Sequence, residues 1–225
     1  MVTKYNNYRY DELSEKSNTV GIKFDVMVTG VTGAGKSTTL NALFQKTVTK
    51  VGKGVEPETM QIDSFELNDA FRLWDTPGLG DGIERDKKHS KKIVELLGER
   101  YDGAFGFIDL VLVVIEGSNR DMGTTYKLLN EVIIPNFPSE RILVAINQAD
   151  LAMKGRYWDH ESNKPNEKLE AFLVEQSKSI TRRVKEATGV GLIQPVFYSA
   201  EKHYNLDKVF DLLIDNMPMC KRSLS

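Results

Sequence analysis

The chain has 225 residues with 30 basic and 32 acidic side chains, and its formal net charge of −2 excludes a generally basic, nucleic-acid-coating protein. This length allows one sizeable core but not comfortably two, and 40% apolar residues is ordinary for a globular protein. A single cysteine, Cys220, excludes an internal disulfide framework and is typical of a reducing compartment. The longest apolar run, 110–115, is too short to span a bilayer, and residues 1–18 lack the apolar centre of a signal peptide. We therefore expect a cytoplasmic protein.

Residues 1–20 are polar without a clear period, and we expect either a short leading helix or a fragment of a longer element there. Apolar strands and amphipathic helices then alternate, which is typical of α/β folds. In chain order, the expected strands are 24–29, 60–67, 70–74, 110–115, 142–146 and 195–198. The expected helices are 37–44, 86–97, 124–132, 167–188 and 206–216. The second and third strands are expected to pair antiparallel across the sequence LNDA.

One long stretch, 152–166, is predicted to lack regular structure. Loops of this length inside a compact domain tend to be functional. Tyr157 and Trp158 in this stretch either pin the loop to the core or contact a partner.

The sequence GVTGAGKS, residues 30–37, matches G-x-x-x-x-G-K-S and lies between an expected strand and an expected helix. Its glycines let successive N–H groups turn toward a phosphate, and the helix N-terminus adds a positive dipole end. Lys36 is expected at the terminal phosphates, Ser37 on Mg²⁺ and Thr38 at the inner phosphate. The other residues expected to contact the nucleotide are Gly30, Thr32, Gly33, Ala34 and Gly35. The match predicts a nucleoside triphosphate site; a chance glycine-rich turn is the alternative.

A second motif, DTPG, follows the apolar strand ending in RLW. Asp75 stands at the strand end, where a carboxylate can hold Mg²⁺ through water. Gly78 can offer its N–H to the γ-phosphate.

Two further strand ends indicate which base is read. In ILVAINQAD, the carboxylate of Asp150 can accept hydrogen bonds from guanine N1–H and the exocyclic amine, whereas adenine offers neither donor. In VFYSAEK, a backbone N–H can meet guanine O6. The residues expected to contact the base are Asn147, Gln148, Asp150, Ser199, Ala200 and Glu201.

These four motifs in this order resemble the G domain of the translation-factor-like (TRAFAC) P-loop GTPases over about residues 22–216. The sequence looks most like the group that contains Era, the septins, the immunity GTPases of plants and animals, and bacterial Era-related GTPases. The resemblance implies a three-layer G domain at 22–218, with a mostly parallel six-stranded sheet and one antiparallel edge strand. Residues 1–21 would be an N-terminal extension and 219–225 a C-terminal tail. Thr59 would be the switch threonine that closes on Mg²⁺; a strand-capping threonine is the alternative.

The sequence departs from the family pattern at two positions. The usual lysine of the base-reading motif is Gln148, which predicts weaker guanine binding without loss of its identity. Leu79 stands where Ras-like proteins carry a water-orienting glutamine, and leucine cannot orient water.

Lys36, Thr59 and Gly78 are the residues expected to act in GTP hydrolysis, with a slow unassisted rate on the order of 10⁻⁴ to 10⁻² per second. The candidates to hold the attacking water are Glu58, Asp81 and Glu84. Septin-like relatives pair their G domains across the nucleotide. A second copy would then supply Arg85 or Arg120, for which solvated surface charge is the alternative.

Residues 85–92, RDKKHSKK, form a dense basic run that we interpret as a solvated helix face, with contact to an acidic partner or RNA as the functional alternative. His89, His160 and His203 lack metal-ligand spacing and are expected at the surface.

We therefore predict a protein that binds GTP and GDP with Mg²⁺, hydrolyses GTP slowly, and signals its nucleotide state to an effector protein or RNA through its switch loops, with a nucleotide-dependent homodimer as one form. One alternative is a GTP-dependent assembly module with negligible hydrolysis, which Leu79 favours slightly. Another is an ATP-using small-molecule kinase, which Asp150 opposes.

Overall fold

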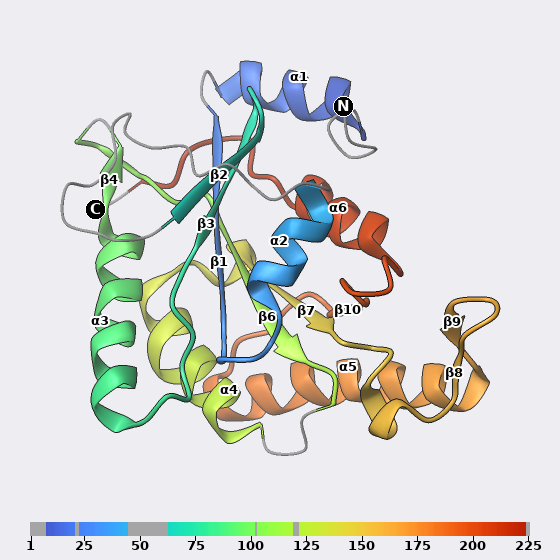
Figure 1. The fold of residues 1–225 in the computed structure, drawn as a ribbon. Helices are drawn as coiled ribbons and strands as arrows, with labels where there is room; N and C mark the ends of the chain where they lie inside the picture. The colour runs from blue at the N-terminus through green and yellow to red at the C-terminus, as the bar shows by residue number, and fades with distance from the viewer. Residues whose placement is uncertain (1–7, 21–22, 45–62, 102, 119–121, 224–225) are drawn as a thin grey trace.

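The computed structural model describes residues 8–20, 23–44, 63–101, 103–118 and 122–223. Six strands form one sheet in the order β10-β7-β6-β1-β3-β2 (Figure 1). Neighbouring strands run parallel except β2 and β3, which pair antiparallel at one edge. The strands are β1 Phe24–Gly30, β2 Asp63–Asn68, β3 Phe71–Asp75, β6 Leu110–Glu116, β7 Ile142–Asn147 and β10 Val196–Phe197. The predicted mixed sheet with one antiparallel edge strand is confirmed.

The central strands read as continuous apolar runs because both faces of the sheet are covered. Successive residues of β6 point to opposite faces, so Leu112 joins one core cluster and Val113 the other. Helices α2 (Lys36–Phe44) and α6 (Leu206–Asp215) contribute to the first cluster. Helices α3 (Ile83–Gly98) and α5 (Glu167–Thr188) contribute to the second. The result is the expected three-layer arrangement.

The expected helix 124–132 is divided. Helix α4 covers Gly123–Lys127, and the chain continues as a π-helical segment, Leu128–Ile133, and a 3₁₀ turn, Ile134–Asn136. Pro135 lacks a backbone N–H and therefore ends the regular helix. A short ribbon that the sequence analysis does not predict, β4 Arg100–Tyr101 with β5 Phe105–Gly106, follows α3.

The prediction that 152–166 lacks regular structure is wrong. A 3₁₀ turn, Ala152–Gly155, precedes a hairpin of β8 Trp158–Asp159 and β9 Lys164–Pro165. The side chain of Asp159 organises the turn, because its Oδ1 accepts hydrogen bonds from the backbone N–H groups of Glu161 and Ser162.

The two aromatic residues of this hairpin differ in role. Trp158 is buried and packs edge-on against Tyr204, with 5.3 Å between ring centroids, which confirms its pinning role. Tyr157 is exposed, and its hydroxyl accepts a hydrogen bond from Lys168 instead.

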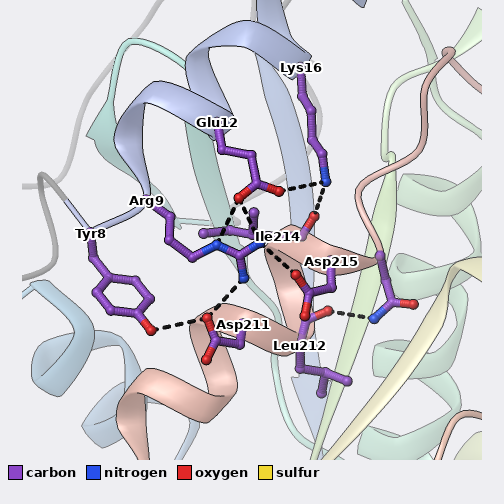
Figure 2. A network of polar contacts seen from close by, with 9 residues as sticks. Tyr8, Arg9, Glu12, Lys16, Asp211, Leu212, Ile214 and Asp215 are labelled. Carbon is purple, nitrogen blue, oxygen red and sulfur yellow. Dashed lines mark hydrogen bonds and ion pairs between the residues drawn. The ribbon is translucent and has the colours of Figure 1, made fainter.

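Helix α1 (Tyr10–Val20) packs against α6 through a polar network centred on Arg9 (Figure 2). The guanidinium lies 2.9 Å from Asp211, 2.6 Å from Asp215 and 2.7 Å from Glu12. Leu13 of α1 is buried in the same core cluster as α6. Of the two alternatives expected for residues 1–20, the short leading helix is therefore present, and both charge and apolar contact anchor it. No helix in the described ranges combines the length and apolarity needed to span a membrane.

The segment after α6 is also integrated into the fold. Lys221 is buried and its Nζ lies 2.5 Å from Asp109 Oδ2. The Lys221 ammonium is also 3.9 Å from Asp25, whose Oδ1 accepts a hydrogen bond from Trp74 Nε1 at 2.8 Å. Next to it, Arg222 donates to the carbonyl of Leu97. Lys221, expected in the tail, is therefore the buried cation that pairs with Asp109, while Asp25 has its shorter ion pair with Arg72, at 2.6 Å.

Replacement of this cation should be costly. Lys221→Met leaves Asp109 and Asp25 buried with less compensation, so we expect the free energy of unfolding, measured by urea titration, to fall by about 3 kcal/mol. Burial raises the pKa of Asp109, which Lys221 partly offsets. A carboxyl whose pKa is raised in the folded state stabilises the fold at low pH, where it is protonated. The loss of unfolding free energy in Lys221→Met should therefore be smaller near about pH 5 than near about pH 8. The exposed Lys208→Met is the control; equal effects of both changes would contradict this account.

Candidate nucleotide-binding site

A cleft of about 620 Å³ opens where β1 leads into α2, beside the end of β3. It gathers most of the residues that the sequence analysis expects at the phosphates and places Gln148 at its border. The expected residues that line it are Thr32, Gly33, Gly35, Lys36, Ser37, Thr38, Asp75, Gly78 and Gln148. The first N–H groups of α2 have no intrahelical acceptor, so this end of the helix can bind anions.

Lys36 is buried at the floor of the cleft. Its Nζ lies 3.4 Å from the carbonyl oxygen of Gly30 and 3.2 Å from that of Val31. Burial lowers the pKa of Lys36, while the nearby carboxylates of Asp75 and Asp81 act in the opposite direction. The ammonium has no carboxylate within ion-pair distance among the described residues. Such a cation is electrostatically suited to a phosphate.

Gly78 lies against this ammonium. A methyl group at Gly78 would lie 2.7 Å from the backbone nitrogen of Thr32 and 2.8 Å from Lys36 Nζ, so only glycine permits the approach. The next residue, Leu79, fixes the approach through two backbone hydrogen bonds. Thr32 N–H donates to its carbonyl at 2.6 Å, and its own N–H donates to Gly30 at 3.3 Å.

The side chain of Leu79 is buried in the core cluster on the α3 face. Leu79 therefore packs the DTPG segment against the core. Its buried apolar side chain cannot orient a water molecule. The sequence analysis predicts only the second of these consequences.

Ser37 and Asp75 meet in the cleft, where Ser37 Oγ donates to Asp75 Oδ2 at 3.2 Å. A hydroxyl and a carboxylate are hard oxygen ligands of the kind Mg²⁺ prefers, so this pair fits the expected ion. Within the described ranges no group of three or more His, Cys, Asp or Glu side chains could hold a metal. Mg²⁺ commonly completes its shell with water and substrate phosphates, so two protein ligands are sufficient.

The prediction that His89 is an ordinary surface residue is wrong. His89 is half-buried and lines the cleft, with Nδ1 2.7 Å from the carbonyl oxygen of Gly78. Because a carbonyl only accepts, Nδ1 carries the proton and donates. Lys92, one turn further along α3, lines the same cleft. The basic run 85–92 therefore has two residues in the cleft, which no spacing rule in the sequence predicts. His160 and His203 are exposed, as expected.

The turn before α3 is held by a residue that the sequence analysis also overlooks. Asp86 Oδ1 accepts hydrogen bonds from the backbone N–H groups of Gly80 and Asp81, at 2.8 and 3.2 Å. The candidates Asp81, Glu84 and Arg85 are all exposed in this region. Thr59, Glu58 and Arg120 lie outside the described residues.

Asn147, at the end of β7, connects the two halves of the site. Its Nδ2 donates to the carbonyl of Ala34 at 3.0 Å, and its Oδ1 accepts from the backbone N–H of Ala200 at 3.0 Å. Gly35, in a left-handed conformation at φ 82°, leaves room for this amide, because a methyl group there would lie 2.3 Å from Nδ2. Gln148 also donates, from Nε2 to the carbonyl of Gly33 at 2.9 Å. It is thus tied to the phosphate loop.

Asp150 is only 6% exposed, and among the described residues no group donates a hydrogen bond to its Oδ1. A buried carboxylate oxygen without a donor is costly, so it is a suitable acceptor for a ligand. Nearby, Ser199 and Ala200 are buried and Glu201 is exposed. The backbone N–H of Ala200 already donates a hydrogen bond to Asn147 Oδ1, a contact that the motif alone does not predict.

The fold and this site define a P-loop nucleotide-binding domain. Residues 25–148, more than half of the chain, match the family described as 50S ribosome-binding GTPase. The chain belongs to this family of GTP-binding P-loop GTPase domains, and the predicted Era-like and septin-like resemblance is confirmed.

Septins are among the similar curated proteins. Septin-12 from Homo sapiens is 35% identical over 103 residues, covering 41% of this chain and 28% of the septin. Septin-8 from Xenopus tropicalis is 29% identical over 99 residues, covering 41% of this chain and 23% of the septin. These matches span less than a third of the septins' own length.

Solved structures show the same fold at low identity. Era from Aquifex aeolicus bound to GDP.AlF4- has a TM-score of 0.54 at 18% identity, with 86% of this chain and 56% of that chain covered. LeoA, a bacterial dynamin GTPase from ETEC, has a TM-score of 0.60 at 12% identity, with 92% and 38% covered.

Proposed function

We propose that this domain binds GTP through the cleft and the buried Asp150, hydrolyses it to GDP and phosphate with Mg²⁺, and uses the Gly78 segment to distinguish the two nucleotides. The observation that carries the proposal is the close approach of Gly78 to the Lys36 ammonium, where a methyl group added at Gly78 would lie 2.8 Å from Nζ. A terminal phosphate bound by Lys36 would lie beside the Gly78 backbone. Loss of that phosphate would remove the contact and release the segment.

The residues divide the task by their chemistry. Lys36 and the N–H groups of the phosphate loop would neutralise phosphate charge, while Ser37 and Asp75 would hold Mg²⁺. When bound, this ion supplies further charge neutralisation at the β- and γ-phosphates. Thr59 remains a proposed third ligand in the switch. Phosphoryl transfer depends mainly on positioning and electrostatics, so these groups are sufficient for slow turnover.

Single-turnover phosphate release, measured with excess protein over GTP, tests hydrolysis directly. We expect release at a rate on the order of 10⁻⁴ to 10⁻² per second that ceases when Mg²⁺ is chelated. Absence of release from bound GTP over many hours would favour the alternative, a GTP-dependent assembly module. The buried Leu79 favours that alternative, because its side chain cannot orient water.

Substitution of His89 should affect GTP hydrolysis more than GDP binding. The reason is that His89 donates a hydrogen bond to the carbonyl of Gly78, the residue proposed to contact the γ-phosphate. We expect His89→Leu to lower single-turnover hydrolysis about five- to tenfold, the worth of one hydrogen bond, with GDP affinity unchanged. His89→Asn keeps a donor near the position of Nδ1 and should retain most of the activity. The exposed His203→Leu is the control. Equal losses in the leucine and asparagine variants would contradict this role.

A second copy of the chain is the proposed source of further charge neutralisation. Arg85 is exposed in the first turn of α3, and Ile83, two positions earlier, is 76% exposed, an apolar side chain suited to a contact between subunits. Specific activity should therefore rise with protein concentration from nanomolar to tens of micromolar, and Arg85→Ala should flatten that rise. The exposed Arg182→Ala should not. A flat concentration dependence in the unmodified protein would contradict dimerisation.

A further inference from the structure

A second cavity, of about 590 Å³, lies between α4, α5 and the turn after Asp150. We call it the α4–α5 cavity. No residue in the described part of the chain lines both this cavity and the phosphate cleft. Its volume is in the range of small-molecule sites, roughly 300–1,000 Å³. The residues that give it its chemistry are Tyr126, Arg156, Phe172, Gln176, Ile180 and Arg183.

The wall of the α4–α5 cavity is largely apolar and aromatic. Ile180 is buried at its base, and Phe172 remains 41% exposed on α5 although it is a large apolar side chain. Tyr126 contributes a second ring, over which the Arg183 guanidinium lies at 5.9 Å. Rings and a branched aliphatic side chain around one hollow suit a flat apolar group.

The charge of the cavity is positive. Lys154, Arg156 and Arg183 line it together with one acidic residue, Glu175. Within the described ranges, none of the three cations is in ion-pair contact with an acidic side chain. The excess of cations therefore favours an anionic ligand.

One of the lining residues, Gln176, also has a side-chain acceptor without a partner among the described residues. Gln176 donates from Nε2 to the carbonyl of Gly117 at 3.4 Å. Its Oε1 is buried, and no donor among the described residues reaches it. A ligand N–H or O–H would satisfy this oxygen.

The turn that borders the cavity is strained and is continuous with Asp150. Met153, Lys154 and Tyr157 have φ values of 54°, 64° and 70°, a region that side chains other than glycine rarely adopt. The same turn is joined to the base-reading segment, because Ala152 N–H donates to Gln148, itself at φ 58°. Strain of this kind clusters at ligand sites and switch regions.

We propose that the α4–α5 cavity is a binding site for a small anionic aromatic molecule, and that its occupancy changes the affinity of the nucleotide site through the turn 148–157. The binding itself is independent of the proposed function; only the coupling rests on it. The flat apolar group would lie against Phe172 and Tyr126, and the anion would face Arg156 and Arg183.

The probe is the dye anilinonaphthalene sulfonate, which combines fused rings, an N–H group and one negative charge. Its fluorescence is titrated with the folded protein, first without nucleotide and then with saturating GDP and Mg²⁺. We expect saturable binding of one dye per chain in both conditions. No saturable binding, or an apparent dye affinity that keeps falling in proportion to added GDP without levelling off, would overturn the proposal. The titration without nucleotide measures dye binding even if GDP fails to bind.

Matched variants locate the dye. Phe172→Glu and Arg156→Glu should each weaken dye binding about tenfold or more, because they place negative charge in the cavity. Ile193→Glu and Arg182→Glu are the controls, because neither residue lines the cavity. The exposed fraction of Ile193, 40%, is similar to that of Phe172, 41%. Equal losses in variants and controls would overturn the assignment. Circular dichroism and thermal unfolding confirm that each variant is folded.

Coupling is measured as the GDP affinity with and without saturating dye. We expect the two affinities to differ, and the dye affinity to change by the same factor when GDP binds, as linkage requires. Phe172→Glu should abolish the difference while it leaves GDP affinity without dye unchanged. A GDP affinity that does not respond to the dye would overturn the coupling.

Discussion

Lys36→Met should abolish tight nucleotide binding while leaving the nucleotide-free protein as stable as before, or more so. The methionine keeps most of the side-chain volume but removes the ammonium at the floor of the cleft. Loss of a buried charge that pairs with phosphate costs about 3 kcal/mol, so GTP and GDP affinities measured by calorimetry should fall at least about 100-fold.

The stability of this variant separates the binding defect from misfolding. Burial lowers the pKa of Lys36, so its folded-state pKa is depressed and the charged form opposes folding at neutral pH. Removal of the charge should therefore not lower the melting temperature of the nucleotide-free protein. Lys91→Met, on the exposed face of α3 where the side chain is 79% exposed, is the matched control for the charge change. Nucleotide affinity within threefold or so of the original in Lys36→Met would contradict the assignment.

Asp150→Asn should change which base is bound. Aspartate offers two acceptors, whereas asparagine offers one acceptor and one donor, and the donor would meet the exocyclic amine of guanine. Xanthine carries a carbonyl oxygen in place of that amine. We expect GDP affinity to fall about 100-fold and xanthosine diphosphate to become the better ligand, because a mismatched buried polar group costs about 2–3 kcal/mol.

The exposed Asp207→Asn should retain GDP preference and serves as the control. Because Asp150 Oδ1 has no donor among the described residues, its neutralisation should not destabilise the nucleotide-free protein. Unchanged discrimination between guanine and xanthine in Asp150→Asn would contradict the proposed contact.

The positions of the central strands follow from patterns that can be read in the sequence. The runs at 110–115 and 142–146 are apolar throughout because helices cover both faces of the sheet, and the glycine-rich loop between β1 and α2 has a fixed spacing. By contrast, the hairpin of β8 and β9 has strands of two residues each. Elements this short have no period to detect, and a side-chain cap at Asp159 and the burial of Trp158 stabilise them.

The contacts that escaped prediction, one in the site and one in the core, join residues that are distant in the sequence. His89 reaches Gly78 across eleven positions, and Lys221 reaches Asp109 across more than a hundred. Nothing in the local sequence of either residue distinguishes it from a surface cation. The residues of the phosphate loop, 30–37, in contrast, act through the backbone geometry of one short loop, so their spacing alone predicts where they gather.

The recognition of guanine by Asp150 is the central claim, and calorimetry of the unmodified protein with GDP and with ADP, each with Mg²⁺, tests it most directly. An unpaired buried carboxylate facing adenine predicts that GDP binds at least about 100-fold more tightly than ADP. Equal affinities for the two nucleotides would contradict the claim.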